Sequence, residues 1–520
     1  MTASLTLRNL TAQPLTLKVI ERYEAPNPKD YPPNAGVGPG SNATANLTSG
    51  VANLTTNLTT LLNNVVNTGN ASSKSGSPKN SPKGSPSASR RASRADIPLA
   101  ENAQSFAKED VDIRVDAFTT KKTDINTTER SAHDVLRLTF EGEGGGRWRI
   151  DTSVTSNASK VLSAIHNDPK HDYSGVYLPK SSFLAISETT DVQKWMSHLS
   201  DDVPLSGLSI PGTHNSPCYY KALPSVRCQQ VSPLEQLQQG VRFFDLRVQP
   251  SNPEDKSDEG LTLVHGAFPI SLTGSKKFRP LVKEIQQFLS ANPSETIIIS
   301  VKREGPGEST DKQLGEILKD HYTNPKQWFT EPRIPKLGEV RGRIVLMRRF
   351  ELSGRLKGEW NGKGWCLDAN NWAYNTPHHT AGDISVQDFC EVMEKDTIDK
   401  KITLACEHFE RAAAVKIDKE DKKFPPFYLN FLSASNFWNV GCWPEAIAAK
   451  LNPACVAFLC EKHEIGDKGV DGPGEAFDGD GGVGIVVCDW VGRDDNWDLV
   501  RCIVGMNARL LLRDKGHGWK

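Results

Sequence analysis

Apolar and polar residues alternate in the first 190 residues, on both sides of a long polar stretch. Leu5 and Leu7, and later Leu15, Leu17 and Val19, are each separated by one polar residue. Such alternation is typical of strands with one buried face. The segments DVDIRVDAF, DVLRLTF and GRWRIDTS also show strand patterns, and EGEGGG provides a turn between the last two. Residues 1–26 and 105–190 are therefore predicted to form a β-rich N-terminal domain.

The polar stretch between these parts, residues 27–104, is rich in Pro, Gly, Asn, Ser and Thr. It cannot bury enough apolar surface to offset the entropy lost on ordering, so a disordered low-complexity insertion is predicted. Residues 74–94 contain six basic and no acidic residues, which fits either a solvated tail or a weak tether to an anionic surface. RRAS and three Ser-Pro pairs there resemble kinase sites, and phosphorylation would cancel the positive charge.

From residue 192 onward, short apolar runs alternate with helical patterns. The runs are GLSIPG, VRFFDLRV, LTLVHG, TIIISVK, GRIVLM, FYLNFLS and GIVVCDW. In FRPLVKEIQQFLSANP, one helical face carries Leu281, Val282, Ile285, Phe288 and Leu289, and Asn292-Pro293 ends the helix. This alternation predicts a parallel sheet with helices outside it. The number of runs and the length of residues 192–520 favour a closed (β/α)8 barrel over an open sheet.

Polar side chains follow or end almost every predicted strand of this barrel. They are His214, Asp245 with Arg247, His265, Lys302-Arg303-Glu304, Arg348-Arg349, Tyr428 with Asn430, and Asp489. Each alone is weak evidence, since an isolated histidine is more often structural and an arginine at a strand end is often solvated. Because active sites of such barrels lie at the carboxyl ends of the strands, the set together predicts a cationic cleft with two histidines and at least two carboxylates.

These residue types suit the cleavage of a phosphodiester. Two histidines can serve as general acid and general base near neutral pH. Arginine and lysine bind phosphate, and the guanidinium group offers a planar fork of donors. A carboxylate beside a histidine fixes its tautomer and stabilises the imidazolium.

The composition excludes some partners and favours one compartment. The formal net charge is −1, so no overall field attracts nucleic acid or membrane. No apolar run has the length of a transmembrane segment, and the N-terminus lacks the pattern of a secretory signal. The ten cysteines show no CxxC pair, which fits free buried thiols. We therefore expect a cytoplasmic protein, with peripheral attachment to membranes as an option.

The segments LSIPGTHNS, QLQQGVRFFDLRV, LVHGAF, FLSANPSETIIISVKRE and RGRIVLMRRF resemble the X region of phosphatidylinositol-specific phospholipase C. The resemblance is to the bacterial-type, metal-independent branch and covers roughly residues 192–500. It implies a distorted TIM barrel and a phosphatidylinositol-type lipid at a membrane surface as the partner. The first product implied is inositol 1,2-cyclic phosphate.

The resemblance also implies a role for each matched residue. His214 would be the general base for the inositol 2-hydroxyl, and His265 the general acid for the leaving diacylglycerol oxygen. Arg247 would hold the phosphate, Asp245 would belong to the network around it, and Asp489 would orient His214. Lys302, Arg348 and Tyr428 would line the inositol pocket.

Asn215 departs from the metal-free pattern, in which an aspartate usually follows the base histidine. Calcium-dependent relatives carry His-Asn, with the asparagine as a metal ligand. However, Arg247 and Lys302 stand where those enzymes carry carboxylates, and two cations would repel a divalent metal. The prediction is therefore catalysis without a cofactor, with Ca²⁺ as the alternative and Asn215 as a substrate-binding residue.

Two functions remain open from the sequence. The first is an enzyme that cleaves phosphatidylinositol or a related inositol phosphodiester. The second is a weakly active or inactive module that binds inositol lipid, an alternative that rests on Asn215. Trp365, Asp368 and Trp372, in the segment GWCLDANNWAYNTP, fit either rim positions for sugar or membrane contact or ordinary core and loop positions.

Overall fold

The computed structural model describes residues 4–24, 99, 103–127, 135–152, 158–166, 171–189, 191–255, 258–418, 421–463 and 479–512. Of the predicted insertion, residues 27–104, only 99, 103 and 104 are among them. The basic segment and the kinase-like motifs lie outside the described residues.

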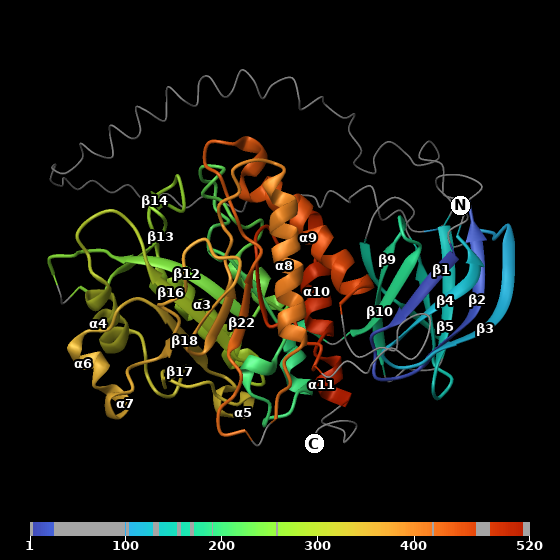
Figure 1. The fold of residues 1–520 in the computed structure, drawn as a ribbon, viewed down its shortest axis with the longest axis horizontal. Helices are drawn as coiled ribbons and strands as arrows, with labels where there is room; N and C mark the ends of the chain where they lie inside the picture. The colour runs from blue at the N-terminus through green and yellow to red at the C-terminus, as the bar shows by residue number, and fades with distance from the viewer. Residues whose placement is uncertain are drawn as a thin grey trace, which may run out of the picture. The chain divides into compact units, whose positions relative to one another are not determined.

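The described residues before 190 form two five-stranded sheets (Figure 1). The first has the order β4 (Thr119–Asn126), β1 (Ser4–Asn9), β10 (Phe183–Thr189), β9 (Asp172–Leu178), β7 (Ala158–Val161). The second has the order β3 (Ala107–Val115), β2 (Leu15–Tyr23), β5 (Val135–Gly142), β6 (Arg147–Asp151), β8 (Ser163–His166). The alternating leucines of the N-terminus are buried in the core that these sheets share, with Phe140 and Trp148.

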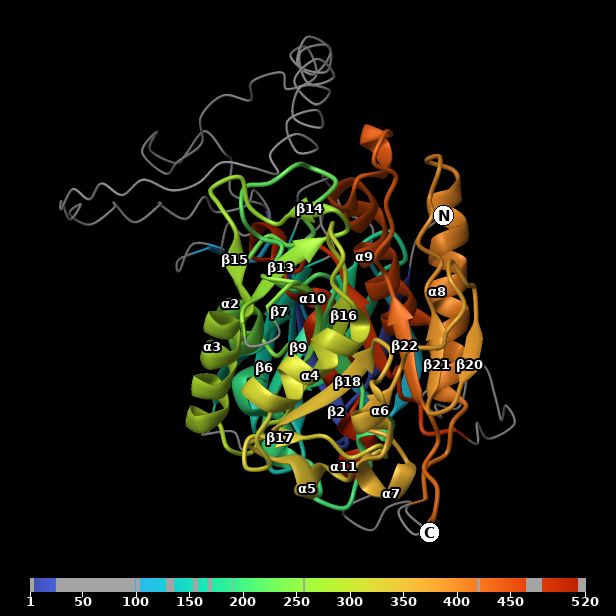
Figure 2. The same ribbon diagram turned by 90° about the vertical axis from the view of Figure 1, so that its left-hand side faces the viewer.

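A large curled sheet forms the rest of the structure (Figure 2). Its order is β17 (Trp328–Phe329), β18 (Ile344–Arg349), β16 (Ile297–Arg303), β12 (Phe243–Pro250), β11 (Ile210–Thr213), β23 (Ile485–Cys488), β22 (Phe427–Phe431), β21 (Ile384–Gln387), β20 (His379–Ala381). Neighbours from β17 to β21 pair in parallel, and β20 pairs antiparallel to β21. β19 (Leu367–Asp368) pairs in parallel with β18. The predicted mixed α/β class is therefore confirmed, with a sheet that is curled.

One predicted strand has a different place from the one expected. The run LTLVH is β13 (Leu261–His265), and it pairs antiparallel with the end of β12, as Val248 with Leu263. It continues antiparallel with β14 (Phe268–Pro269) and β15 (Lys276–Lys277). The chain returns after only a short loop from β12, which permits a hairpin but no parallel crossover. His265 therefore lies on a hairpin above the sheet and not at the end of a parallel strand.

Helices pack around the curled sheet, most of them on its outer face. They are α2 (Pro233–Gln238), α3 (Phe278–Ala291), α4 (Asp311–His321), α5 (Leu337–Val340), α6 (Gly354–Lys357), α7 (Glu359–Gly362), α8 (Thr397–Ala413), α9 (Pro444–Glu461), α10 (Asp498–Gly505) and α11 (Ala508–Leu512). The predicted helix is α3, which buries all five predicted apolar residues and ends at Asn292. No helix in the described part of the chain combines the length and apolar character that a membrane crossing requires.

Two hydrophobic cores lie on opposite faces of the curled sheet. Along β18, Val345 and Met347 belong to the inner core, whereas Ile344 and Leu346 belong to the outer core beneath the helices. Successive residues of a strand point to opposite faces, so both faces of a buried parallel strand are apolar. A side chain's place in the site therefore depends on which of the two faces it occupies.

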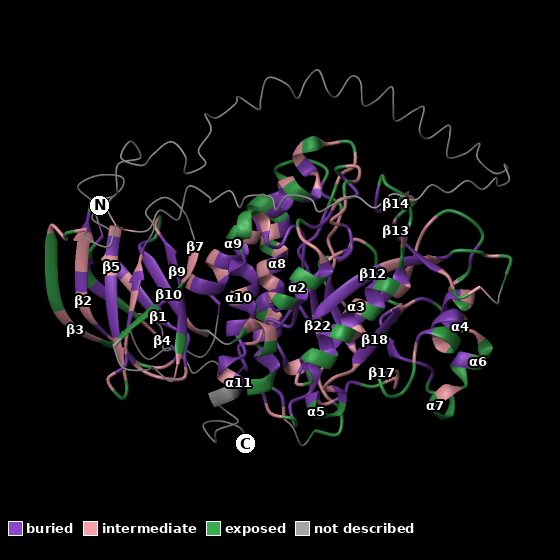
Figure 3. Ribbon diagram, turned by 180° about the vertical axis from the view of Figure 1, so that it is seen from behind, coloured by how far each residue is buried: buried purple, intermediate pink, exposed green. Residues whose placement is uncertain are grey.

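The outer core also joins the N-terminal sheets to the helices of the curled sheet. It includes Leu178 and Phe183 of the N-terminal part together with Cys460 and Met506. Figure 3 shows this buried region along β9, β10 and α10. The two regions therefore pack through a shared apolar interior.

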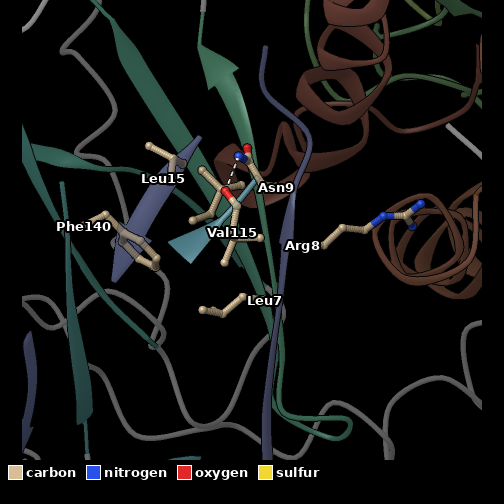
Figure 4. A pocket seen from close by; sticks show the side chains of 7 residues that line it. Leu7, Arg8, Asn9, Leu15, Val115 and Phe140 are labelled. Carbon is tan, nitrogen blue, oxygen red and sulfur yellow. Dashed lines mark hydrogen bonds between the residues drawn. The ribbon is translucent and has the colours of Figure 1, made fainter. Parts of the chain in front are cut away.

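Arg8 of β1 anchors this contact. Leu7 and Asn9, on either side of it, face the space between the two N-terminal sheets, where Asn9 Nδ2 donates to the Val115 carbonyl over 3.1 Å. Figure 4 shows Arg8 directed the opposite way, toward a helix. Its guanidinium donates to the carbonyls of Cys460, at the end of α9, and His463. The space between the sheets, lined by apolar residues such as Leu15 and Phe140, has no room for a water molecule, so it is not a ligand site.

A buried histidine of α8 is expected to make the fold sensitive to acid. Burial, and then the charges of His378 and Arg411, lowers the pKa of His408 to about 3. In the unfolded chain His408 binds a proton near pH 6.5, whereas in the folded chain it does so only near pH 3. Stability therefore decreases as the pH is lowered from the first value to the second. Between about pH 6 and about pH 4.5, we expect the wild type to lose about 2 kcal/mol more stability than His408→Phe. Urea unfolding at both pH values measures this, with exposed His198→Phe as the control.

Candidate active site

The inner face of the curled sheet changes from apolar to charged along its strands. On β12, Phe243 belongs to the inner core, and Asp245 and Arg247 follow it at a spacing of two. On β18, Met347 of the inner core is followed two residues later by Arg349. Because alternate residues share a face, the charged side chains gather above the apolar floor. The arrangement therefore creates a polar site at the carboxyl ends of the parallel strands.

His214 lies directly after β11, and two partners fix its ring. Its backbone N–H donates to the Cys488 carbonyl, and Nδ1 lies 2.8 Å from Asp489 Oδ1. On the other side of the ring, Arg247 Nη2 donates to Nε2 over 2.8 Å. The turn that follows depends on Asn215, whose φ of 42° lies in the left-handed region that asparagine tolerates.

The protonation of His214 follows from these contacts. Burial lowers the pKa of His214, but the opposing contributions, the largest of them from the Asp489 carboxylate, together outweigh it and raise the pKa to about 9. A ring with that pKa would carry a proton on both nitrogens at neutral pH, whereas the contact with Arg247 requires a lone pair on Nε2. The contact decides, because a guanidinium only donates. The ring is thus neutral, with its proton on Nδ1 toward Asp489.

Arg247 is the centre of the charge network. Its Nη1 donates to Glu304 Oε1 over 3.0 Å, and its Nη2 lies 3.4 Å from Asp245 Oδ2 as well as against His214. Burial opposes the charge of this guanidinium, but Glu304 and Asp245 raise the Arg247 pKa above its ordinary value. Burial likewise opposes ionisation of Asp245, yet Arg247 and then Arg349 hold its pKa below the usual range. Carboxylates therefore fix Arg247 beside His214.

His265 faces His214 from the β13–β14 hairpin. The two ring centroids are 5.9 Å apart, and the ring planes are nearly perpendicular, at 88°. His265 Nδ1 donates to the Val226 carbonyl over 2.9 Å. Nε2 is thus the nitrogen left for proton exchange with a ligand. The hairpin is tied to the network, because the Gly266 N–H donates to Glu304.

Asn215 and Cys228 lie beside the two histidines. The Asn215 backbone N–H donates to Asp245 over 3.2 Å, and its Nδ2 is 3.3 Å from His214 Nε2. Cys228 Sγ is 3.9 Å from Asn215 Nδ2 and 3.7 Å from His265 Nδ1. Burial raises the pKa of the Cys228 thiol to about 12, so it is neutral. Ligand atoms of His214, Cys228 and Asp489 all lie within 4.8 Å of one another.

The structure brings most of the predicted residues together but not Arg348. This arginine is on the outer face of β18, where it donates to the carbonyls of Trp365 and Phe350 and pairs with Asp368. The neighbouring Arg349 takes the predicted position, 3.4 Å from Asp245 Oδ1. Arg348 and Arg349 both end β18, and consecutive strand residues point to opposite faces. An error of one residue in the prediction therefore exchanges an inward side chain for an outward one.

Tyr428 is also away from the site. Inner-core residues Leu429 and Phe431 flank the outward positions of β22, so Tyr428 faces α8, with its ring 5.6 Å from that of His408. Lys302 is at the rim, with Nζ 2.9 Å from Glu304 and its side chain 39% exposed. A ligand in the site can therefore reach Lys302 but not Tyr428.

The structure gives four further residues a place in the site. The sequence analysis named Glu304 and Arg349 only as polar residues at strand ends and Trp372 as an optional rim residue, and it did not name Asp388. Glu304 holds Arg247 and Lys302, and Arg349 stacks on Trp372 with its guanidinium carbon 4.0 Å from the ring centroid. Trp372 Nε1 in turn donates to Asp388 over 3.2 Å. Glu304 follows Lys302 at a spacing of two, which is a signal that the sequence already contained. Trp365, by contrast, is a fully buried residue of the outer core.

The two neighbouring arginines offer a matched test of this placement. We expect Arg349→Met to lower kcat/KM for an inositol phosphodiester by about 10²-fold, since it removes a charge-assisted contact worth about 3 kcal/mol. Arg348→Met should leave kcat/KM within about threefold and lower the melting temperature, because two buried carbonyls lose their donor. Equal losses of activity in both variants would contradict the assignment.

The sequence of residues 202–350 matches the family described as phosphatidylinositol-specific phospholipase C, X domain. A 1-phosphatidylinositol phosphodiesterase of Listeria monocytogenes is 34% identical over 172 residues, which cover 31% of this chain and 50% of that protein. One from Staphylococcus aureus (strain Newman) is 28% identical over 290 residues, covering 52% of this chain and 85% of that protein. This chain thus spans half the length of the Listeria relative.

A human relative and a solved structure extend the comparison. The human PI-PLC X domain-containing protein 1 is 28% identical over 162 residues, covering 25% of this chain and 48% of that protein. The structure of a double mutant of the S. aureus phosphatidylinositol-specific phospholipase C is 24% identical. It covers 61% of this chain and 97% of its own, with a TM-score of 0.46.

Proposed function

We propose that this chain is a phosphodiesterase for inositol phospholipids, because residues 202–350 match the family described as phosphatidylinositol-specific phospholipase C, X domain. It cleaves phosphatidylinositol or a related inositol phosphodiester by general acid/base catalysis. The observation that supports this best is the pair of facing histidines, 5.9 Å apart, with Arg247 bonded to one of them. The two histidines can carry out both proton transfers of the reaction, and Arg247 can balance the charge of one phosphate.

The first step is attack by the inositol 2-hydroxyl on phosphorus. His214 Nε2 accepts the hydroxyl proton, while Asp489 holds the Nδ1–H and stabilises the positive ring. In the structure Nε2 is engaged by Arg247. An incoming phosphate competes for this guanidinium, so binding of the substrate frees the lone pair of the base.

Arg247 and His265 serve the phosphate and the leaving group. As the new P–O bond forms, negative charge grows on the non-bridging oxygens, and the Arg247 guanidinium stabilises it. The bond from phosphorus to the diacylglycerol oxygen breaks, and this oxygen takes a proton from His265 Nε2. The product is inositol 1,2-cyclic phosphate. Lys302 and Arg349 are placed to bind inositol hydroxyls.

Catalysis proceeds without a metal ion in this proposal. The carboxylates of Asp245 and Glu304 already pair with Arg247, and Lys302 pairs with Glu304. A calcium ion requires several free oxygen ligands, and Asn215 alone does not supply them. Cationic side chains therefore take the place of a metal beside the phosphate.

Two finer features of the architecture belong to the same proposal. We count the curled sheet as a distorted (β/α)8 barrel that is not closed by strand pairing, since no ladder among the described residues joins β20 or β21 to β17 or β19. Residues 1–26 and 105–190 then form a β-rich domain, with residues 27–104 as an insertion. The ten free cysteines, none in a disulfide, favour a cytoplasmic location.

The enzyme acts at a membrane surface through an apolar rim. Trp438 and Met393, 76% and 60% exposed, follow β22 and β21 on loops joined by the hydrogen bond from Asn436 Nδ2 to the Met393 carbonyl. The ring of Phe437 stacks on Phe268 of the β13–β14 hairpin, with centroids 5.7 Å apart. These loops surround the site, so a bilayer that contacts them presents its headgroups to the histidines.

Removing the exposed indole of this rim tests membrane attachment. We expect Trp438→Ala to weaken binding to phosphatidylinositol vesicles about tenfold, which corresponds to partial burial of one large apolar side chain. Trp360 of α7, 44% exposed and on the opposite end of the sheet (Figures 1 and 2), is the control. Vesicle sedimentation measures both variants, and an equal loss for Trp360→Ala would contradict the rim as the contact surface.

The proposed reaction is tested by analysing products from radiolabelled phosphatidylinositol. Inositol 1,2-cyclic phosphate should form in the presence of EDTA, and its rate should not rise with added calcium. Activity that appears only with calcium would contradict the metal-free mechanism. Specific binding of inositol lipid with no turnover would favour the alternative, a lipid-binding module in which Asn215 has impaired the site.

A further inference from the structure

A buried thiol lies between the two catalytic histidines without a part in the proposed reaction. Cys228 is fully buried, and its Sγ is within 3.7 Å of His265 Nδ1. Together with a ring nitrogen of His214 and a carboxylate oxygen of Asp489, it forms a cluster of three potential metal ligands within 4.8 Å. One sulfur, one nitrogen and one oxygen donor thus lie close together.

This donor set selects one class of cation. Zinc binds sulfur at about 2.3 Å and nitrogen or oxygen at about 2.0–2.2 Å in tetrahedral sites. Its ligand atoms are then roughly 3.3–3.8 Å apart, so movements of about 1 Å would bring the cluster into range. Calcium and magnesium prefer oxygen ligands and gain little from a thiolate and an imidazole.

An unpartnered amide oxygen supports a ligand at the same place. Asn215 is buried, and its Oδ1 lacks a hydrogen-bond partner among the described residues. The amide lies against the cluster, with Nδ2 3.3 Å from His214 Nε2 and 3.9 Å from Cys228 Sγ. Rotating the amide by half a turn exchanges its nitrogen and oxygen, and Oδ1 would then face the region between His214 and Cys228.

We propose that His214, Cys228 and Asp489 form an inhibitory site for zinc or a similar borderline-soft divalent cation. The Cys228 S–H bond breaks, an S–metal bond forms, and the proton leaves to solvent, with no change of oxidation state. The metal also takes the His214 Nδ1 lone pair. The ring proton must then move from Nδ1 to Nε2, the atom that has to accept the substrate proton. A bound cation therefore disables the base by changing its tautomer.

Metal binding itself does not depend on the proposed reaction, whereas inhibition does. The full chain is titrated with Co²⁺, which replaces zinc and shows a thiolate-to-metal absorption band in the near ultraviolet. We expect this band in the wild type, its loss in Cys228→Ser and Cys228→Ala, and its retention in Cys455→Ser, where an equally buried thiol of α9 is changed. The band decides on the site even if the chain cleaves no inositol phosphodiester.

Inhibition is measured as the cyclic phosphate formed at rising zinc concentration, relative to the metal-free rate of each variant. The half-inhibitory zinc concentration should rise at least tenfold in Cys228→Ser and stay unchanged in Cys455→Ser, and EDTA should restore the rate. Calcium and magnesium should not inhibit. Absence of the cobalt band in the wild type, an undiminished band in both Cys228 variants, or equal zinc inhibition with and without the thiol would overturn the proposal.

Discussion

Replacing His265 by alanine is expected to lower the rate of phosphatidylinositol cleavage by about 10²–10⁴-fold, the usual contribution of a general acid. The loss should shrink strongly with a nitrophenyl ester of inositol phosphate, because nitrophenolate leaves without receiving a proton. His214→Ala should lose a similar factor with both substrates, since the 2-hydroxyl must release its proton in either case. The ratio of kcat/KM values for the two substrates thus distinguishes acid from base.

A matched control comes from the N-terminal sheets. His171 Nδ1 lies 2.9 Å from Glu188, a pair much like His214 with Asp489, but far from any arginine of the site. His171→Ala should leave both substrates unaffected. If the nitrophenyl ester rescued His214→Ala as well as His265→Ala, the roles assigned here to the two rings would be wrong.

Replacing Arg247 by lysine is expected to reduce kcat by about 10²–10³-fold, comparable to the loss of one preorganised donor to a developing oxyanion. The guanidinium contacts Glu304 through one nitrogen, and Asp245 and His214 through the other. A lysine has a single ammonium group, which cannot occupy both places. It would keep the charge but not the geometry.

The neighbouring strand offers the same substitution outside the site. Arg303 pairs with Asp311 over 2.7 Å, at the start of α4. Arg303→Lys should therefore keep kcat within about twofold. Because Asp245 is fully buried, Arg247→Lys should also lower the melting temperature, and activity must be compared well below it. Undiminished kcat in folded Arg247→Lys would show that a planar fork of donors is not needed.

Strand positions could be predicted from the sequence more reliably than the faces of the strands. His214, Asp245, Arg247 and Asp489 end or follow apolar runs, and the structure brings all four into one network. The face was predictable on β12, where the polar residues Asp245, Arg247 and Gln249 alternate with apolar ones and so share one face. On β18 it was not, because the residues before Arg348 and Arg349 are apolar on both faces.

Long-range partners account for the other differences. LTLVH has the composition of a barrel strand, and only its pairing with β12 shows that it is part of a hairpin. Tyr428 was placed in the inositol pocket by the family resemblance, whereas α8 covers its face of β22. Glu304 was visible beside Lys302, but its importance depends on reaching Arg247, which lies 57 residues earlier in the chain.

Because the outer core is shared, the part of the chain that has to fold together is larger than the part that carries the proposed catalytic residues. Every residue assigned to the reaction comes after residue 213, yet Leu178, Phe183 and Arg8 complete the surroundings of α9 and α10. A chain cut at residue 191 would expose this apolar seam and leave the end of α9 without its guanidinium partner. The N-terminal strands therefore take no part in the proposed chemistry, but a stable catalytic region has to be expressed together with them.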